Sequence, residues 1–351
     1  MSRQIADTRI RKTTPLVKPG TLAQDCPVDD ESASFIADAR DQIAAILRGD
    51  DTRVLAIVGP CSIHDPKALL EFADKLKSCE DSLEDAVYPV LRAYFEKPRT
   101  VIGWKGLIND PDLDGSFRVN HGLKTARGLL REVAELRIAA ATEFLDTTLG
   151  QYYADLVSFG AIGARTVESQ IHRELASGLS MPVGFKNATS GDIAVAIDAI
   201  RSAHESHWFP SLMHDGNPAI LQASGNPDSY LILRGGKESG PNYSASFVNA
   251  AASRMHESGI EPGIIVDCSH GNSEKDPQKQ PGVLRDVCAQ LEAGQTAIRG
   301  VMIESHLVAG SQPIGPRESL VYGQSITDAC LAWDDTKPLL EQLANAVRDS
   351  R

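Results

Sequence analysis

Eight short apolar runs alternate along the chain with longer segments of helical periodicity. Within each run the apolar residues are nearly continuous, which is typical of strands buried on both faces of a parallel sheet. Apolar residues recur three or four positions apart in the intervening segments, which predicts amphipathic helices. The expected strands are residues 54–61, 88–96, 143–148, 159–165, 181–187, 229–235, 263–270 and 300–306. Eight strand–helix units favour an α/β fold of the closed (β/α)8 TIM-barrel type.

An open, doubly wound sheet is the alternative fold, and the first strand–helix turn argues against it. Such sheets usually carry a glycine-rich phosphate loop at that turn. Residues 59–66 read GPCSIHDP, which is neither GxGxxG nor a Walker A motif. We expect residues 1–50 to form an N-terminal arm and helix with an oligomerisation or regulatory role. Residues 51–351 would form the catalytic barrel, with a β-hairpin inserted at about 209–223.

Composition argues against two classes of partner. The net charge is −12 and aromatic residues make up 5% of the chain, so neither the overall field nor stacking favours nucleic acid. No apolar run reaches about 18 residues, which argues against a membrane span. The six cysteines show no disulfide-framework spacing and no apolar signal region precedes them, which predicts a reduced, cytoplasmic protein.

Charged residues collect where the expected strands end, and barrel active sites lie at that end. The strand expected at 143–148 has Glu143 at its start and Asp146 at its end. Arginine and lysine match the geometry and charge of phosphate and carboxylate groups, so a shared pocket would bind phosphorylated substrates. A solvated rim is the alternative for any one of these residues. The cations at or after strands two, four, five and six are Arg92, Lys97, Arg99, Arg165, Lys186 and Arg234.

A second set of residues, of metal-ligand type, ends the first, seventh and eighth strands and the loop beyond. Cys61, His270, Glu304 and Asp328 offer sulfur, nitrogen and oxygen donors, which suit a divalent first-row ion. The alternatives are that Cys61 is a small buried apolar residue and that His270 belongs to the core or caps a helix. Cys330 lies two residues beyond Asp328, so we also expect a Cys61–Cys330 disulfide on oxidation, unless Cys330 is merely buried.

Several long motifs resemble 3-deoxy-D-arabino-heptulosonate-7-phosphate (DAHP) synthase, class I, in its feedback-regulated bacterial and fungal subgroup. The motifs are GPCSIHDP, RAYFEKPRTVIGWKGLINDP, GAIGARTVESQIHRELASGLSMPVGFKN, LILRGG, DCSHGNS and YGQSITD. The resemblance implies a (β/α)8 barrel that condenses phosphoenolpyruvate, erythrose 4-phosphate and water to DAHP and inorganic phosphate. That reaction opens the shikimate pathway to chorismate and the aromatic amino acids.

The resemblance also implies roles for individual residues. The metal ligands would be Cys61, His270, Glu304 and Asp328, around manganese, iron, cobalt or zinc. Phosphoenolpyruvate would be bound by Arg92, Lys97, Arg165, Lys186 and Arg234, and erythrose 4-phosphate by Lys97, Pro98, Arg99 and Thr100. Lys97, with Cys61 and His270, would be catalytic, and Glu143 and Asp267 would orient water or neighbouring groups.

An aromatic amino acid is the effector that the resemblance implies. The matching positions are Asp7, Gln151, Leu175, Leu179, Ser180, Phe209, Ser211 and Leu221. Serine at position 211 resembles the phenylalanine-sensitive form, whereas the tyrosine-sensitive form has glycine there. The surrounding segment LMHDGNPAILQ diverges from the family and leaves the effector open. VGFKNATSGD also departs from the usual VGFKNGTDG, although Lys186 and Asn187 remain. The arm would pack on a neighbouring subunit of a homodimer or homotetramer, and a disordered tail is the alternative.

Three other functions compete with this interpretation. The sister synthase uses arabinose 5-phosphate, but it typically lacks both KPRT and the long arm. A metal-dependent aldolase would release no phosphate. A non-catalytic sensor of aromatic amino acids would not need the complete set of four metal-type ligands.

Overall fold

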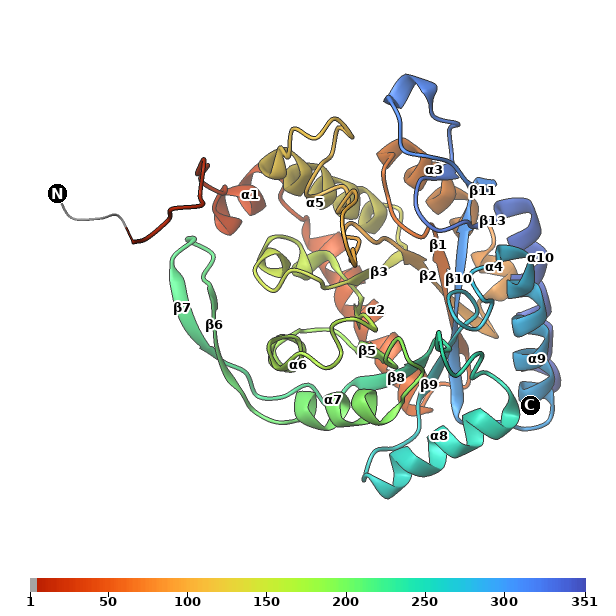
Figure 1. The fold of residues 1–351 in the computed structure, drawn as a ribbon. Coiled ribbons are helices and arrows are strands. Elements are labelled where there is room, and N and C mark those ends of the chain that lie inside the picture. Colours follow the sequence, from red (N-terminus) through yellow and green to blue (C-terminus); the bar gives the residue numbers. More distant parts are fainter. Residues whose placement is uncertain (1–4) are drawn as a thin grey trace.

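A barrel of eight parallel strands is closed by pairing of β1 with β10 as well as with β2 (Figure 1). The structure is a computed structural model that describes residues 5–351. Every barrel strand is almost wholly buried, which explains why the sequence shows continuous apolar runs. In barrel order the strands are β1 (Val54–Gly59), β2 (Val87–Arg92), β3 (Ala139–Glu143), β4 (Phe159–Ile162), β5 (Val183–Lys186), β8 (Ser229–Leu233), β9 (Ile264–Asp267) and β10 (Ile298–His306). The predicted (β/α)8 fold is confirmed.

Helices surround the barrel and bury their apolar faces against the outer side of the strands. Asp65 begins the first of them: its carboxylate accepts hydrogen bonds from the backbone of Lys67 and Ala68, and Pro66 sets the first turn. The helices are α3 (Pro66–Lys77), α4 (Glu80–Leu83), α5 (Val119–Glu135), α6 (Gln170–Ser177), α7 (Ala194–His204), α8 (Ala245–Glu257), α9 (Gln280–Glu292) and α10 (Trp333–Asp349).

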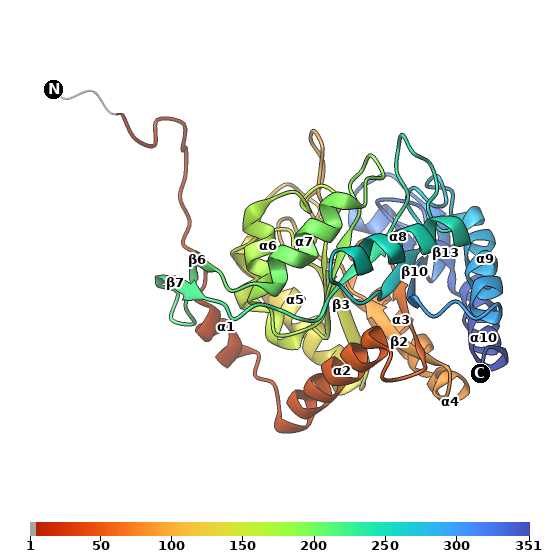
Figure 2. The ribbon, with the colours of Figure 1, turned by 90° about the horizontal axis from the view of Figure 1, so that it is seen from below.

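Inside the barrel lies a second apolar core, and α2 (Asp30–Arg48) contributes to it. Ile43, Ile46 and Leu47 of this helix pack in one cluster with inward residues of the strands, such as Leu55 and Ile265. Figure 2 shows α2 lying across one end of the barrel. This end is therefore filled with apolar side chains, and α2 belongs to the same packed unit as the strands.

The third strand is displaced from the predicted position. We expected it at 143–148, but β3 ends at Glu143, so this residue stands at the end of its strand and not at the start. Alanine has a weak preference for strands, and Ala139–Ala141 follow α5 after a turn of only a few residues. The alanines therefore give no strand signal in the sequence, whereas pairing with β2 and β4 makes them a strand. The second strand is also shorter than expected and ends at Arg92.

The arm before α2 is attached to the barrel only in part. Val17 accepts a hydrogen bond from the Tyr152 hydroxyl at 2.7 Å. A short helix, α1 (Pro19–Asp25), follows, and the Gly20 N–H donates to the His214 carbonyl at 2.6 Å. His214 lies in the turn of the predicted hairpin, between β6 (Trp208–Leu212) and β7 (Pro218–Gln222). Residues 5–14 are exposed and run away from the barrel (Figure 2).

Smaller elements complete the loops at the barrel ends. These are η1 (Leu149–Tyr152), η2 (Ala154–Leu156), η3 (Pro277–Lys279), η4 (Arg317–Ser319), β11 (Val308–Ser311), β12 (Gln324–Ser325) and β13 (Leu331–Ala332). Among residues 5–351, we find no helix with the length and hydropathy that crossing a bilayer would require.

Candidate active site

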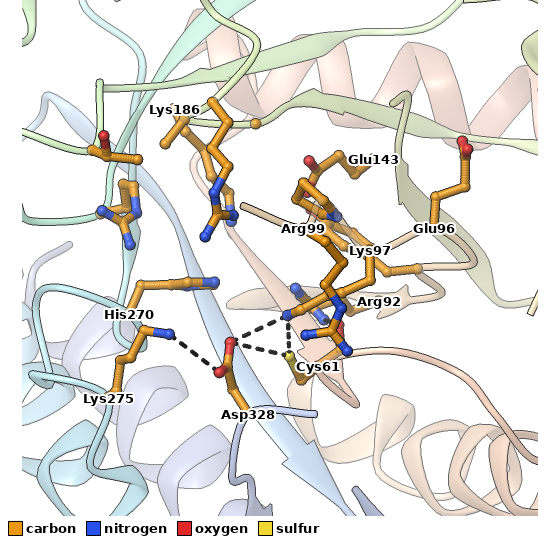
Figure 3. A pocket seen from close by; sticks show the side chains of 17 residues that line it. Cys61, Arg92, Glu96, Lys97, Arg99, Glu143, Lys186, His270, Lys275 and Asp328 are labelled. Atoms are coloured by element: carbon orange, nitrogen blue, oxygen red, sulfur yellow. Dashed lines mark hydrogen bonds and ion pairs between the residues drawn. The ribbon is translucent and has the colours of Figure 1, made fainter. Parts of the chain in front are cut away.

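One pocket at the carboxyl ends of the strands collects most of the predicted site residues (Figure 3). All six predicted cations reach it, together with Pro98 and Glu143. Glu304 and Asp267 lie beneath its surface and are buried, while Thr100 is exposed on the nearby loop. The pocket is lined by Cys61, Arg92, Tyr94, Glu96, Lys97, Pro98, Arg99, Glu143, Gly163, Ala164, Arg165, Lys186, Thr189, Arg234, His270, Lys275 and Asp328.

Three of the four predicted metal ligands form a compact donor cluster. One donor atom each from Cys61, Glu304 and Asp328 lies within 4.8 Å of the other two. His270 stands next to this group, with its Nε2 3.6 Å from Glu304 Oε1. The backbone of His270 has a positive φ of 55°, a conformation that few non-glycine residues adopt, at the turn that follows β9. Thiolate, imidazole and carboxylate donors at this spacing fit a divalent cation.

Lysine ammonium groups lie against the same donors. Lys97 Nζ is 2.7 Å from Cys61 Sγ and 3.2 Å from Asp328 Oδ2, and Lys275 Nζ is 3.2 Å from Asp328 Oδ1 (Figure 3). Burial of Asp328 raises the pKa of its carboxyl, but the two lysines outweigh that effect and hold the pKa well below its ordinary value. The cluster therefore attracts positive charge, which supports its assignment as a cation site.

Lys275 is a pocket residue that the sequence interpretation missed. It lies several residues beyond the end of β9, in a loop where Glu274 and Lys275 both have positive φ. The strand-end pattern covers residues close to the strands, whereas this turn brings a more distant lysine back to the pocket. Its charge alone did not distinguish it from other loop lysines.

Arg92 and Lys186 are both anchored by buried carboxylates. Arg92 Nη2 lies 3.0 Å from Glu304 Oε1, and its Nη1 donates to the Cys61 carbonyl at 2.8 Å and also to the Pro60 carbonyl. Lys186 Nζ lies 3.0 Å from Asp267 Oδ2. These contacts fix the direction of two buried cations, which would otherwise be costly to remove from water.

Asp267 lies where the lysine and the metal-ligand groups meet. Its Oδ2 is 2.9 Å from His270 Nδ1, and its Oδ1 accepts hydrogen bonds from the Ser269 hydroxyl and N–H. Burial alone would raise the pKa of this carboxyl, but Lys186, His270 and Ser269 bring it well below the ordinary value. Asp267 therefore supports Lys186 on one side and sets the orientation of the His270 ring on the other.

Glu143 faces the pocket without a hydrogen-bond partner for its buried Oε1. The loop after β4 passes close to this carboxylate, and only the absence of a side chain at Gly163 leaves space for it. A Cβ on Gly163 would lie 2.2 Å from Glu143 Oε1. The unpartnered oxygen is an acceptor available to a ligand or water.

Cys330 lies directly behind Cys61. It is fully buried, and its Sγ accepts a hydrogen bond from the Cys61 N–H at 3.4 Å. Both cysteines are free thiols in this structure. The Cys61–Cys330 disulfide stays a prediction.

A second cavity, between α6 and the β6–β7 hairpin, gathers six of the eight predicted effector positions. They are Gln151, Leu175, Leu179, Ser180, Phe209 and Leu221. Ser211 is on the hairpin but does not line this cavity, and its Oγ is buried without a partner. Asp7 is exposed in the arm and does not reach the cavity in its own chain.

Comparison with known proteins identifies the family of this chain. Residues 25–341 match the DAHP synthetase I family. The chain belongs to this family. It is 52% identical over the full length of both chains to the Phe-sensitive phospho-2-dehydro-3-deoxyheptonate aldolase of Escherichia coli K12. It is also 52% identical to the Trp-sensitive enzyme of that strain, over 97% of each chain. The phospho-2-dehydro-3-deoxyheptonate aldolase structure from Francisella tularensis SCHU S4 superposes with a TM-score of 0.95 at 49% identity, covering 97% of this chain and 99% of the other.

Glu96, on the pocket wall, should make stability depend on pH. Burial raises the pKa of this carboxyl to about 7 from an ordinary 4.5, while Asp146 N–H and Tyr153 OH donate to its Oε2 at 3.3 Å. Since the unfolded chain ionises first, unfolding releases a proton between these pH values. The contribution of Glu96 to the free energy of unfolding should be greatest below pH 4.5 and fall by up to about 3 kcal/mol as pH rises through 7.

Glu96→Gln should remove this fall, which urea unfolding at several pH values between 4.5 and 8 would measure. Glu132→Gln, at an exposed position of α5, is the matched control and should keep the wild-type pH dependence. An unchanged pH dependence in Glu96→Gln would contradict the prediction.

Proposed function

We propose that the protein is a DAHP synthase, EC 2.5.1.54, which condenses phosphoenolpyruvate with erythrose 4-phosphate and releases inorganic phosphate. The observation that carries the proposal is the pairing of two groups of side chains in one pocket. A thiol and two carboxylates form a cation site, and arginines and lysines beside it suit two phosphorylated substrates. Family membership supports the same reaction.

The cations that the strands bring to the pocket are suited to phosphoenolpyruvate, which carries both a phosphate and a carboxylate. Arg92, Arg165, Lys186 and Arg234, with Lys97, would bind it. Arg99 and Thr100, exposed on the loop after β2, would hold the phosphate of erythrose 4-phosphate, with Lys97 and Pro98 beside them. Holding both molecules in one pocket turns a bimolecular encounter into a reaction between fixed partners.

The metal ligands are Cys61, His270, Glu304 and Asp328 in this proposal. A divalent ion held there would supply Lewis-acid polarisation of the aldehyde. Mixed sulfur, nitrogen and oxygen ligation admits manganese, iron, cobalt or zinc.

Lys97 is the proposed proton donor. C3 of phosphoenolpyruvate adds to the aldehyde carbon with the enol electron pair, and the aldehyde oxygen becomes an alkoxide that takes a proton from Lys97 Nζ. Burial lowers the pKa of Lys97, but Cys61, Glu304 and Asp328 outweigh it and raise the pKa above its ordinary value, so the amine starts as ammonium. Cys61, next to Lys97, and His270 complete the catalytic set as metal ligands in this proposal.

Water then adds to the electron-poor C2 and gives a hydroxyl there. As the bond from C2 to the bridging oxygen breaks, this hydroxyl becomes the C2 carbonyl of the product, and its proton leaves with the phosphate. Glu143 is placed to take the proton of that water, because its Oε1 is unpartnered in the pocket. Asp267 is already bound to Lys186 and His270, which suits a positioning role.

The reaction itself can be tested by phosphate release. Wild-type protein with phosphoenolpyruvate should release one phosphate for each erythrose 4-phosphate consumed, and arabinose 5-phosphate should be a much poorer partner. Chelation should abolish turnover and a divalent ion should restore it. Preference for arabinose 5-phosphate would indicate the sister synthase, a product that keeps the phosphoenolpyruvate phosphate would indicate an aldolase, and no turnover would indicate a sensor.

Replacement of Lys97 should separate proton donation from binding. Lys97→Ala should lower kcat by about a hundredfold or more, because a positioned general acid typically contributes that much. Lys105→Ala, an exposed lysine of the same loop, should retain wild-type kcat. Steady-state kinetics would measure both, and wild-type turnover in Lys97→Ala would exclude the proton-donor role.

Regulation by an aromatic amino acid is the second part of the proposal. The cavity between α6 and the hairpin would bind the ligand ring among Leu175, Leu179, Phe209 and Leu221. The arm projects beyond its own barrel, so we infer that it packs on a neighbouring subunit and brings Asp7 to that cavity, where its carboxylate can pair with the ligand ammonium. The assembly would be a homodimer or homotetramer in the cytoplasm.

Feedback inhibition should depend on the arm. Wild-type activity should be inhibited most strongly by phenylalanine among the three aromatic amino acids. Deleting residues 1–30 should abolish that inhibition, and Asp7→Asn should weaken it about tenfold through the loss of one ion pair. Asp25→Asn, an exposed position of α1, is the control. Inhibition curves would measure these effects, and full inhibition after deletion would contradict the assignment.

A further inference from the structure

Tyr94 lies beneath two of the cations assigned to phosphoenolpyruvate. The Arg92 guanidinium carbon is 3.7 Å from the centroid of the Tyr94 ring, and Lys186 Nζ is 5.9 Å from the same centroid. Tyr94 is 2% exposed and lines the pocket, two residues beyond the end of β2. One aromatic ring thus lies within cation–π distance of cations from two strands, β2 and β5.

Two neighbouring positive charges in a buried site repel each other, and each needs a compensating group. Glu304 and Asp267 supply one carboxylate to each cation. A further carboxylate would repel an anionic substrate from the same place. The face of an aromatic ring attracts cations through its quadrupole without carrying net charge, so it compensates the pair and leaves the pocket attractive to anions.

The guanidinium carbon of Arg92 lies over the Tyr94 ring at 3.7 Å from its centroid, which holds the group on one side. A cation that lies over a ring keeps its N–H edges free for hydrogen bonding. Two of these edges are used by Glu304 and by the carbonyls of Cys61 and Pro60, while the buried Nε has no partner in the protein. One N–H of Arg92 is therefore left without a protein partner and is available to a ligand.

The Tyr94 hydroxyl does not account for the placement of this ring. It is buried and has no hydrogen-bond partner. The ring itself packs with the apolar side chains inside the barrel. The part of Tyr94 that contacts functional groups is thus its aromatic face.

We propose that Tyr94 is a positioning residue for phosphoenolpyruvate, whose ring face holds Arg92 and Lys186 in binding geometry by cation–π attraction. The proposal rests on the proposed function, which assigns both cations to that substrate. It extends the site by a residue that carries no charge and contacts the substrate only through others.

Stepwise fluorination of the ring at position 94 tests this proposal, because it weakens cation–π attraction with little change of shape. Tyr94→Phe should keep the KM for phosphoenolpyruvate within about twofold of wild type. Mono-, di- and trifluorophenylalanine at position 94 should raise it progressively, by about tenfold for the trifluoro ring. The dissociation constant for phosphoenolpyruvate, measured by calorimetry, should rise in parallel, while kcat and the KM for erythrose 4-phosphate change much less.

Phe95 provides the matched control, since it is 1% exposed and packs against Tyr153 away from the pocket. The same fluorinated residues at position 95 should leave both constants unchanged. A flat series at position 94, or a rise as large in Tyr94→Phe as in the trifluoro protein, would overturn the proposal. If wild-type protein releases no phosphate with the two substrates, the proposed function fails instead, and the calorimetric series still tests the ring.

Discussion

The buried ion pair between Arg92 and Glu304 joins the two halves of the pocket. Glu304 belongs to the cation site through its 3.6 Å approach to His270, and it also anchors an arginine of the anion site at 3.0 Å. Its backbone is fixed as well, because Gln280 donates to its carbonyl and accepts from its N–H. Removing either partner of such a pair leaves an uncompensated buried charge, which typically costs about 3–5 kcal/mol. The relative position of the proposed metal site and the proposed phosphoenolpyruvate site depends on this pair.

The pocket is rich in positive charge, although the molecule around it carries a net negative charge. The chain carries a net charge of −12, yet seven arginine and lysine side chains converge at the strand ends. Carboxylates beneath the surface, Glu304 and Asp267, compensate two of these cations, and the ring of Tyr94 compensates both without adding charge. A local field of this kind attracts phosphorylated anions even though the whole protein is acidic.

The apolar pattern of the sequence was sufficient to predict the barrel, because strands buried on both faces appear in the sequence as continuous apolar runs. It failed at β3, where alanines carry little strand preference and pairing with β2 and β4 decides the structure. Charged residues next to strand ends were predictable, since the barrel brings those ends together. Lys275 was not predictable, because a turn with left-handed residues returns it to the pocket, and Tyr94 was not, because a buried aromatic residue looks like core. Asp7 could be placed only by the resemblance, since its own chain leaves it away from the cavity.

The helix that fills one end of the barrel has a kinetic consequence. Because α2 packs its apolar residues among the strands and closes that end of the barrel, the pocket opens only at the carboxyl ends of the strands. Arg92 and Lys186 lie at depth, whereas Arg99 stands at the rim. If the two substrates occupy the depths proposed above, the one bound deeper would have to enter before the one bound nearer the opening.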